Sequence, residues 1–200
     1  YANIRSLMVV AVILPRFSLA IAAGGRAALA EGPLALAPEP GRAALVGEVS
    51  PAAEALGVAP GMKIAEALAR APRLRLIAAD PVAVADSWER VLVRLESVGA
   101  QVEDGGVGLA CFEARGLGRL HGGSLDGVVK ATRAALKLPA RIGAGSSRFC
   151  AVVAAEQARS RRPSVVDGAA QLAGAPAALL GREPATAKLV EPLGRFGITT

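Results

Sequence analysis

The sequence predicts an α+β fold, in which a ferredoxin-like sheet is built from elements in the order β-α-β-β-α-β. Residues 8–14, MVVAVIL, are a continuous apolar run rich in β-branched residues, which is typical of a strand buried on both faces. Residues 81–98 place Val84, Trp88 and further apolar side chains at helical spacing. Residues 100–113, AQVEDGGVGLACFE, predict an antiparallel hairpin that turns at a Gly-Gly pair.

Residues 16–79 lie between the first strand and the 81–98 helix and are predicted to form an excursion from the sheet. An Ala-rich helix is expected over 16–30, a Pro-punctuated connector over 34–40, and a short strand over 43–49.

A second helical start signal follows within this excursion. Ser50 is a preferred N-cap residue, and Pro51 stands at the first helical position, so a short helix is expected from there to Gly57. A further helix is predicted over 63–70 and a strand over 74–78.

The rest of the sheet follows the hairpin. The glycine-rich residues 115–123 predict a loop, and a helix is expected over 125–138, a strand over 140–144 and a helix over 146–159. Pro163 cannot continue a helix and marks a boundary, after which an Ala-rich helical piece occupies 164–200.

Composition and charge permit a polyanionic partner. The chain has 200 residues and a formal net charge of +6, and aromatic residues are only 3%. Between residues 130 and 162 the only acid is Glu156, whereas the basic residues are Lys130, Arg133, Lys137, Arg141, Arg148, Arg159, Arg161 and Arg162. This local surplus favours a binding face, and a solvated face is the alternative.

The sequence contains only weak signals for metal binding, for export and for insertion into a membrane. Cys111 and Cys150 lie far apart in apolar runs, and His121 is the only histidine, so no metal site is expected and the thiols are interpreted as reduced and cytoplasmic. The apolar run at 7–14 is far shorter than the roughly 20 residues of a membrane span. The chain begins with Tyr1 rather than Met, and we expect it to be part of a longer protein.

Several segments, in the right order, resemble the Y-family (UmuC/DinB-like) translesion DNA polymerases. These are LPRF at 14–17, VSPAAEALGVAPGM at 49–62, the hairpin, and IGAGSSRF at 142–149. Three segments are most similar to the non-catalytic ImuB branch of this family: LPRF at 14–17, LGVAPGM at 56–62 and RGLGRLHGG at 115–123.

The resemblance implies a division of the chain into polymerase-like domains. Residues 1–33 and 74–163 would form a palm, with the first strand and helix in the earlier segment. Residues 34–73 would be a small fingers insertion, and residues 164–200 a truncated, thumb-like helical segment.

In this family three acidic residues hold two divalent cations that promote nucleotidyl transfer. The positions implied here are Val12, in the first strand, and Gly108 and Leu109, in the hairpin. None of them can ligate Mg²⁺, so we expect no catalytic residue, no bound metal and no cofactor, with Mg²⁺ required only if the protein is an active enzyme.

The triphosphate-binding positions of the family are altered as well. The residues aligned with its Tyr and Arg are Pro51 and Glu54. Replacing a guanidinium by a carboxylate turns attraction for the triphosphate into repulsion, so we expect no nucleotide-binding site.

The basic positions of the family are retained, which implies binding of DNA. The candidate DNA-binding residues are Arg148, Arg159, Arg161, Arg162, Ser146 and Ser147. The two serines begin the 146–159 helix, where backbone amides suit a phosphate, although tight packing alone also explains the small residues.

The resemblance therefore implies a non-catalytic adaptor in translesion synthesis and induced mutagenesis. Its implied partners are primer-template DNA, a sliding clamp, a RecA-like accessory protein and an error-prone C-family polymerase, with no membrane. Two alternatives stay open: an active, metal-dependent translesion DNA polymerase, and a ferredoxin-like small-molecule-binding domain without a role in DNA metabolism.

Overall fold

The computed structural model describes residues 8–159, 162–182 and 185–200. The chain divides into two compact units, which are taken separately below. One unit comprises Tyr1–Leu14 and Leu92–Thr200, and the other comprises Pro15–Val91. None of the described helices is long and apolar enough to cross a membrane.

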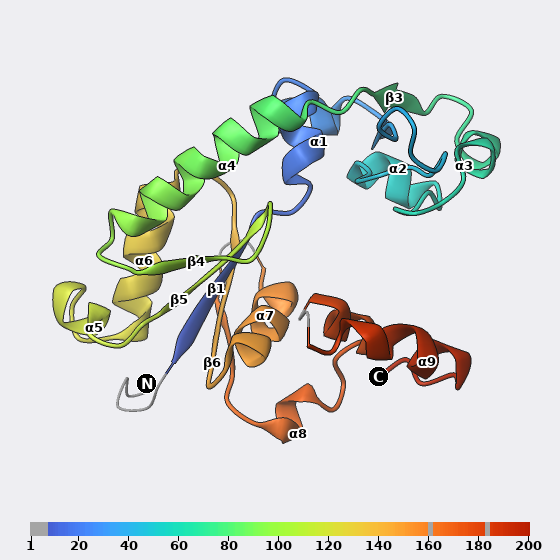
Figure 1. Cartoon of the computed structure of the whole chain (residues 1–200). Coiled ribbons are helices and arrows are strands. Elements are labelled where there is room, and N and C mark those ends of the chain that lie inside the picture. The colour runs from blue at the N-terminus through green and yellow to red at the C-terminus, as the bar shows by residue number, and fades with distance from the viewer. Residues whose placement is uncertain (1–7, 160–161, 183–184) are drawn as a thin grey trace. The chain divides into compact units, whose positions relative to one another are not determined.

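The first unit is built on a five-stranded sheet (Figure 1). Its strands, in spatial order, are β4 (Val102–Asp104), β5 (Leu109–Glu113), β1 (Val9–Ile13), β6 (Arg141–Gly145) and β7 (Ser164–Val166). The central strand β1 pairs antiparallel with both β5 and β6. The α+β class predicted from the sequence is confirmed.

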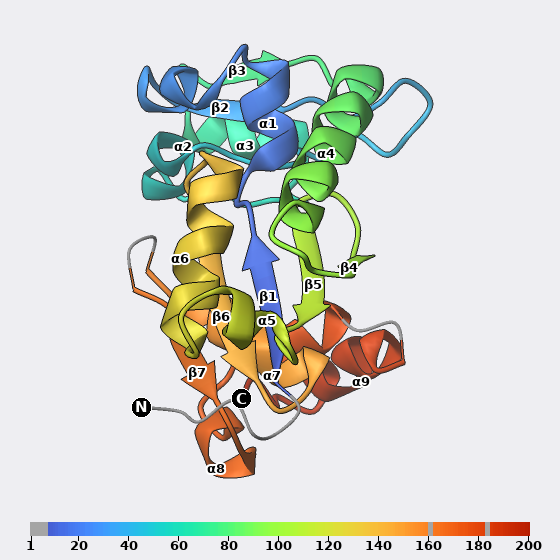
Figure 2. The same cartoon turned by 90° about the vertical axis from the view of Figure 1, so that its left-hand side faces the viewer.

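Helices cover both faces of this sheet, as Figures 1 and 2 show. Helix α7 (Arg148–Gln157) packs on one face, and α6 (Leu125–Leu136) lies on the other. Side chains of β1 alternate between the faces: Ala11 and Ile13 belong to the cluster formed with α7, and Val10 and Val12 point the opposite way. All four are buried, which explains why this strand is apolar at consecutive positions.

Glycines on β6 let the backbone of α7 pack directly against the backbone of this strand. A Cβ placed on Gly143 would lie 2.1 Å from the backbone nitrogen of Ala155, and one on Gly145 would lie 2.5 Å from the Cβ of Cys150. The residues of α7 that face the sheet are correspondingly small, and include Ala151. The IGAG sequence is therefore a packing requirement of this strand.

The hairpin turn is longer than the sequence predicted. It comprises residues 105–108, because Gly106 and Gly108 adopt left-handed φ values of 96° and 86°. The second strand consequently begins at Leu109 rather than at Val107. Within the loop predicted over 115–123, residues Leu117–Leu120 form a short helix, α5.

The prediction that the residues after Pro163 are wholly helical missed a strand. Residues Ser164–Val166 form β7, which pairs parallel with β6 and extends the sheet by one strand. Three residues give too short a pattern to be recognised in isolation, and the strand is stabilised by pairing with a distant segment. Short helices follow: α8 (Ala169–Leu172), η2 (Ala177–Arg182), η3 (Ala187–Leu189) and α9 (Val190–Arg195).

The second unit contains a two-stranded parallel sheet and short helices. Its elements are α1 (Phe17–Ala22), η1 (Arg26–Ala30), β2 (Leu34–Leu36), α2 (Pro51–Ala55), α3 (Ile64–Arg70) and β3 (Arg75–Ile77). Helix α4 (Pro81–Glu96) begins in this unit and ends in the other. Trp88 on α4 is buried against the ring of Phe17, at 5.5 Å between ring centroids.

Three expectations for this region are corrected by the structure. The helix predicted over 16–30 is interrupted at Gly24 and Gly25, where φ is positive. The connector predicted over 34–40 contains β2, which pairs with β3. The strand predicted over 43–49 forms only isolated bridges, because its residues contact separate neighbours rather than one continuous strand.

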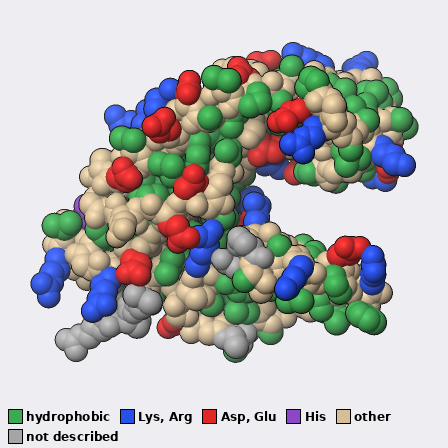
Figure 3. Space-filling model, viewed as in Figure 1, with side chains coloured by type: hydrophobic (Ala, Val, Ile, Leu, Met, Phe, Trp, Pro, Cys, Tyr) green, Lys and Arg blue, Asp and Glu red, His purple; other side chains and the backbone are tan. Residues whose placement is uncertain are grey.

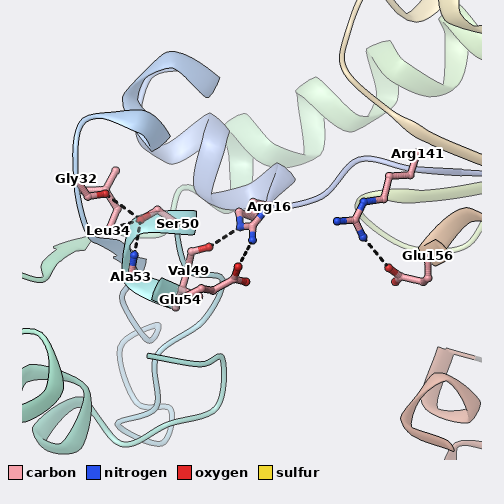
Figure 4. A network of polar contacts seen from close by, with 9 residues as sticks. All are labelled: Arg16, Gly32, Leu34, Val49, Ser50, Ala53, Glu54, Arg141 and Glu156. Carbon is pink, nitrogen blue, oxygen red and sulfur yellow. Dashed lines mark hydrogen bonds and ion pairs between the residues drawn. The ribbon is translucent and has the colours of Figure 1, made fainter. Parts of the chain in front are cut away.

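The helix start predicted at Ser50 and Pro51 is confirmed, and it anchors the second unit. The fully buried Ser50 hydroxyl donates to the Gly32 carbonyl and accepts from the backbone N–H groups of Leu34 and Ala53, at 2.9, 2.9 and 3.3 Å (Figure 4). One side chain thus joins the start of β2 to the start of α2.

Candidate nucleic-acid interface

The centre of the sheet does not bring together the three positions implied for metal binding. Val12 lies opposite Ala110 in the register of β1 and β5, whereas Leu109 lies opposite Ile13. Val12 and Leu109 therefore point to opposite faces of the sheet. Gly108 lies in the turn, where its carbonyl accepts from the backbone N–H of Leu14 at 2.8 Å.

The face that Leu109 shares with Ile13 is apolar. Both side chains are buried in the cluster that α7 covers. Ile13, rather than Val12, is the β1 residue that shares a face with Leu109. Either residue is an aliphatic side chain that cannot bind a cation.

Acidic side chains elsewhere on the hairpin do not replace the missing carboxylates. Among the described residues no group of three His, Cys, Asp or Glu side chains could hold a metal ion. Asp104 accepts from the backbone N–H of Gly106 at 2.8 Å, Glu103 pairs with Arg148, and Glu113 lies at the far end of β5. The residues at the sheet centre do not fit two divalent cations, which require converging oxygen ligands.

In the second unit, Glu54 on α2 is neutralised by an arginine that the sequence did not single out (Figure 4). The Arg16 guanidinium contacts the Glu54 carboxylate at 2.5 Å, and its Nε donates to the Val49 carbonyl at 2.7 Å. The repulsion expected from Glu54 is therefore largely offset by Arg16. Pro51, the other altered position, is the first residue of α2 and offers no polar side chain.

Arg16 is held in an unusual backbone conformation. Its φ of 56° and ψ of 39° are left-handed, which costs a non-glycine residue roughly 1 kcal/mol. Its two partners lie 33 and 38 residues away in sequence. No local pattern could have indicated this contact.

The start of α7 carries three of the predicted DNA-binding residues. Ser147, not Ser146, is the N-cap, and its hydroxyl accepts from the backbone N–H of Cys150 at 3.2 Å. The Ser146 hydroxyl lies 3.9 Å from the Cys150 sulfur. Arg148 is the first helical residue and forms an ion pair with Glu103 on β4, so its charge is already partly balanced within the protein.

The other predicted DNA-binding residues lie beyond the opposite end of α7. Arg159 and Arg162 are both exposed and form an isolated antiparallel bridge, in which the Arg162 backbone N–H donates to the Arg159 carbonyl at 2.9 Å. Arg161 lies outside the described residues. Arg148 begins α7 and Arg159 lies two residues beyond its end, so this 10-residue helix, about 15 Å long, lies between them.

The single acid of the basic segment is also paired within the protein. The Glu156 carboxylate contacts Arg141 at 3.2 Å (Figure 4). It also contacts Arg182, at 3.0 Å. This bridge ties η2 to α7 and β6. On the face seen in Figure 3, basic side chains are interspersed with acidic ones rather than gathered into one patch.

Solved structures of DNA polymerases have a similar fold. An insertion ternary complex of Dbh DNA polymerase matches with a TM-score of 0.72 at 17% identity, and a Y-family DNA polymerase chimera matches with 0.70 at 16%. DinB from Sulfolobus solfataricus matches with 0.68 at 16% identity. Each match covers 96% of this chain and 58% of the polymerase chain, so this chain spans little more than half the length of those proteins.

The fold thus defines the class: a chain with a Y-family polymerase fold whose sheet centre is apolar. No curated protein sequence gives a significant match. The sequence profile of the impB/mucB/samB family matches residues 13–156, well over half of the chain. The protein belongs to the impB/mucB/samB family.

Proposed function

We propose that the protein is a non-catalytic, DNA-binding member of its family that acts as an adaptor in translesion synthesis and induced mutagenesis, in the manner of the ImuB branch. In this proposal residues 1–33 and 74–163 are the palm, residues 34–73 the fingers, and residues 164–200 part of a thumb. The observation that carries it is the apolar sheet centre, where Ile13 and Leu109 face one another in a buried aliphatic cluster.

Binding to primer-template DNA is supported by the exposed arginines beyond α7 and by the capped start of that helix. Arg159 and Arg162 are exposed, and neither forms an ion pair among the described residues. Arg148, Ser146, Ser147 and Arg161 complete the proposed contacts to the phosphate backbone. One of the similar structures is a ternary complex of Dbh DNA polymerase, which is consistent with this assignment.

The adaptor role further requires protein partners. By family resemblance these are a sliding clamp, a RecA-like accessory protein and an error-prone C-family polymerase that performs the synthesis, in the cytoplasm. The proposed DNA contacts position the protein on the primer-template, and protein contacts then recruit the polymerase.

A primer-extension assay tests the non-catalytic assignment. With Mg²⁺ or Mn²⁺, a primer-template and all four deoxynucleotides, we expect no incorporation above that of buffer. The physical reason is that, in the part of the chain that the structure describes, no cluster of acidic side chains could hold the metal ions that activate the primer hydroxyl and stabilise the transferred phosphate. A Y-family polymerase assayed in parallel provides the positive control.

Incorporation that disappears on chelation would instead establish the active polymerase. It would also show that acidic residues at positions other than Val12, Gly108 and Leu109 supply the metal ligands. Because a contaminating polymerase would also need divalent cations, incorporation would have to persist in separately purified protein to be assigned to this chain.

A salt titration tests DNA binding. We expect the double substitution Arg159→Ala with Arg162→Ala to weaken binding to primer-template DNA, and to make the slope of log affinity against log salt less steep by about 2, since each lost phosphate contact removes about 0.9. Fluorescence anisotropy of labelled DNA over a range of salt concentrations measures both quantities.

The matched control is Arg42→Ala with Arg73→Ala, which removes the same charge from exposed positions in the other unit. This control is expected to retain the slope of the unsubstituted protein. Equal slopes for all three proteins would contradict the assigned interface. Absent or salt-insensitive binding would favour the small-molecule-binding domain.

A further inference from the structure

The five-stranded sheet has an open edge at β4. This strand is the first in the spatial order of the sheet, and among the described strands it pairs only with β5 (Figures 1 and 2). The hydrogen bonds of an antiparallel pair alternate along each strand. The Gly105 backbone N–H donates to the Leu109 carbonyl at 2.9 Å. By this alternation the N–H and C=O groups of Val102 and Asp104 are directed away from β5, toward the open edge.

A pocket with a volume of about 600 Å³ lies beside this edge strand. Its apolar walls are formed by Val102, Phe112 and Leu117. Its charged lining side chains are Glu103, Glu113, Arg115 and Arg148. All of these residues belong to one compact unit, so the pocket does not depend on how the two units are arranged.

One carboxylate of the pocket is not balanced within the described part of the protein. Glu103 pairs with Arg148, whereas Glu113 is exposed at the end of β5 and forms no ion pair with a described residue. Arg115 is exposed as well. The pocket therefore offers a carboxylate beside apolar walls, which suits a side chain with an apolar stem and a cationic end.

The hairpin that forms this edge is acidic, although the chain as a whole is basic. The formal net charge of the chain is +6, yet residues 96–113 contain no lysine or arginine and four acids, Glu96, Glu103, Asp104 and Glu113. Figure 3 shows acidic side chains over β4 and β5. This edge therefore attracts cationic groups and repels the phosphates of a nucleic acid.

The same charges disfavour a second copy of the chain as the occupant of the edge. Pairing of β4 with β4 of another copy would bring Glu103 and Asp104 close to the same acids of that copy. Like charges on paired strands are destabilising. The complementary occupant is an extended segment that carries basic side chains.

We propose that β4 and its pocket bind an extended, basic segment of a partner protein, which pairs with β4 as an additional strand of the sheet. Main-chain hydrogen bonds to the outward groups of β4 supply affinity, and a lysine or arginine side chain that enters the pocket toward Glu113 supplies specificity. Phe112 and Leu117 are placed to cover the apolar stem of that side chain.

The spacing of the strands is compatible with this arrangement. Glu103 lies opposite Cys111, and residues two apart on a strand share a face, so Glu103 and Glu113 lie on the same face of the sheet. Neighbouring strands lie about 4.8 Å apart, so the added strand would lie about 10 Å from β5. A long basic side chain, together with that of Glu113, spans this distance.

The inference rests on the proposed adaptor role only in that this role requires a protein partner. The pocket shares Arg148 with the proposed DNA contacts and is otherwise separate from them. A binding test without DNA therefore distinguishes the two proposals.

Fluorescence anisotropy of labelled peptides with the whole chain tests the surface. The probe is an octapeptide with blocked ends in which valine and arginine alternate, and we expect it to bind saturably. A peptide in which valine and glutamate alternate is expected not to bind. The basic peptide with every amide nitrogen methylated should also fail to bind, because it keeps its charge but has no N–H donors to pair with β4.

Val102→Pro and Val102→Ala are a matched pair of variants. Both remove the valine side chain, but only proline removes the N–H that is directed toward the open edge, and the hydrogen bonds between β4 and β5 are kept. We expect Val102→Ala to bind the basic peptide nearly as tightly as the unsubstituted protein, and Val102→Pro to bind it about tenfold more weakly. Glu113→Gln is expected to weaken binding by about fivefold, as for a partly exposed ion pair.

Four results would each overturn the proposal. They are absence of saturable binding by the basic peptide, equal binding of the methylated peptide, equal binding of the glutamate peptide, and equal affinities of Val102→Pro and Val102→Ala. If circular dichroism shows Val102→Pro to be unfolded, Glu113→Gln takes its place, and unchanged affinity in that variant overturns the surface.

Two further measurements separate this surface from its alternatives. If analytical ultracentrifugation shows a dimer that Val102→Pro dissociates, a second copy occupies the edge and the proposal is overturned. Arg159→Ala with Arg162→Ala is expected to bind the basic peptide as the unsubstituted protein does, whatever its effect on DNA binding. Loss of peptide binding in that variant would place the peptide elsewhere and overturn the proposal.

Discussion

Replacing Gly143 by alanine is expected to lower the free energy of unfolding by about 3 kcal/mol, the upper part of the usual range for overpacking a core. The added methyl group would lie 2.1 Å from the backbone nitrogen of Ala155 and 2.4 Å from the carbonyl carbon of Ala154. These are backbone atoms of a buried helix and cannot be moved by rotating a side chain. The helix must shift away from β6 as a whole, which opens gaps along the α7 face of the sheet.

Chemical denaturation followed by circular dichroism measures this loss. Gly174→Ala is the matched control, because a Cβ at Gly174 meets no atom within 4 Å and the residue does not have a left-handed φ. Its stability should be unchanged or higher by about 0.5 kcal/mol, since alanine restricts the unfolded chain. Equal stability of the two variants would contradict the close packing of α7 on β6.

Introducing a carboxylate at Val12 is expected to lower the free energy of unfolding by about 4 kcal/mol at pH 7, because an unpaired charge would be buried. Val12 is only 1% exposed and lies in the middle of β1 between Ala110 and Ile142, so an aspartate there would be buried beside aliphatic side chains. Burial without a partner favours the neutral form and raises the pKa of the new carboxyl above its unfolded value of about 3.9.

The penalty at Val12 should therefore depend on pH. The destabilisation is fully present when the pH is above the raised pKa that the carboxyl has in the folded state, and it decreases as the pH falls below that pKa. Once the pH reaches the pKa of the unfolded state, ionisation no longer contributes to the destabilisation. Comparing Val12→Asp with Val12→Ala at pH 7 and pH 5 separates charge from lost volume, because the alanine variant adds no titrating group. An equal difference between the two variants at both pH values would show that the carboxylate reaches solvent or a cation.

Elements with a strong local pattern could be predicted from the sequence. The central strand, the amphipathic α4 and the Ser50 cap each depend on residues that are neighbours in the chain. Strands β2 and β7 could not be predicted in this way. Each has three residues, and each is stabilised by pairing with a segment far away in sequence.

In the candidate site, too, contacts between residues that are far apart in sequence could not be predicted. Resemblance implied Val12 and Leu109 as members of one site, but a shift of one residue along β1 moves a side chain to the other face, and the register places Ile13 rather than Val12 opposite Leu109. The charge of Glu54 was visible in the sequence, whereas its neutralisation by Arg16 depends on a contact across 38 residues. Spacing alone carries no information about such a pair.

The ion pair between Glu103 and Arg148 has a consequence for the energetics of DNA binding. A phosphate that engages Arg148 competes with the Glu103 carboxylate for the guanidinium, and a displaced carboxylate returns to solvent. The exchange replaces one anion by another at the same guanidinium, so it adds little net release of small ions from the DNA. Arg148 would thus contribute to orientation and register on the duplex, while the arginines that lack an acidic neighbour determine how strongly binding responds to ionic strength.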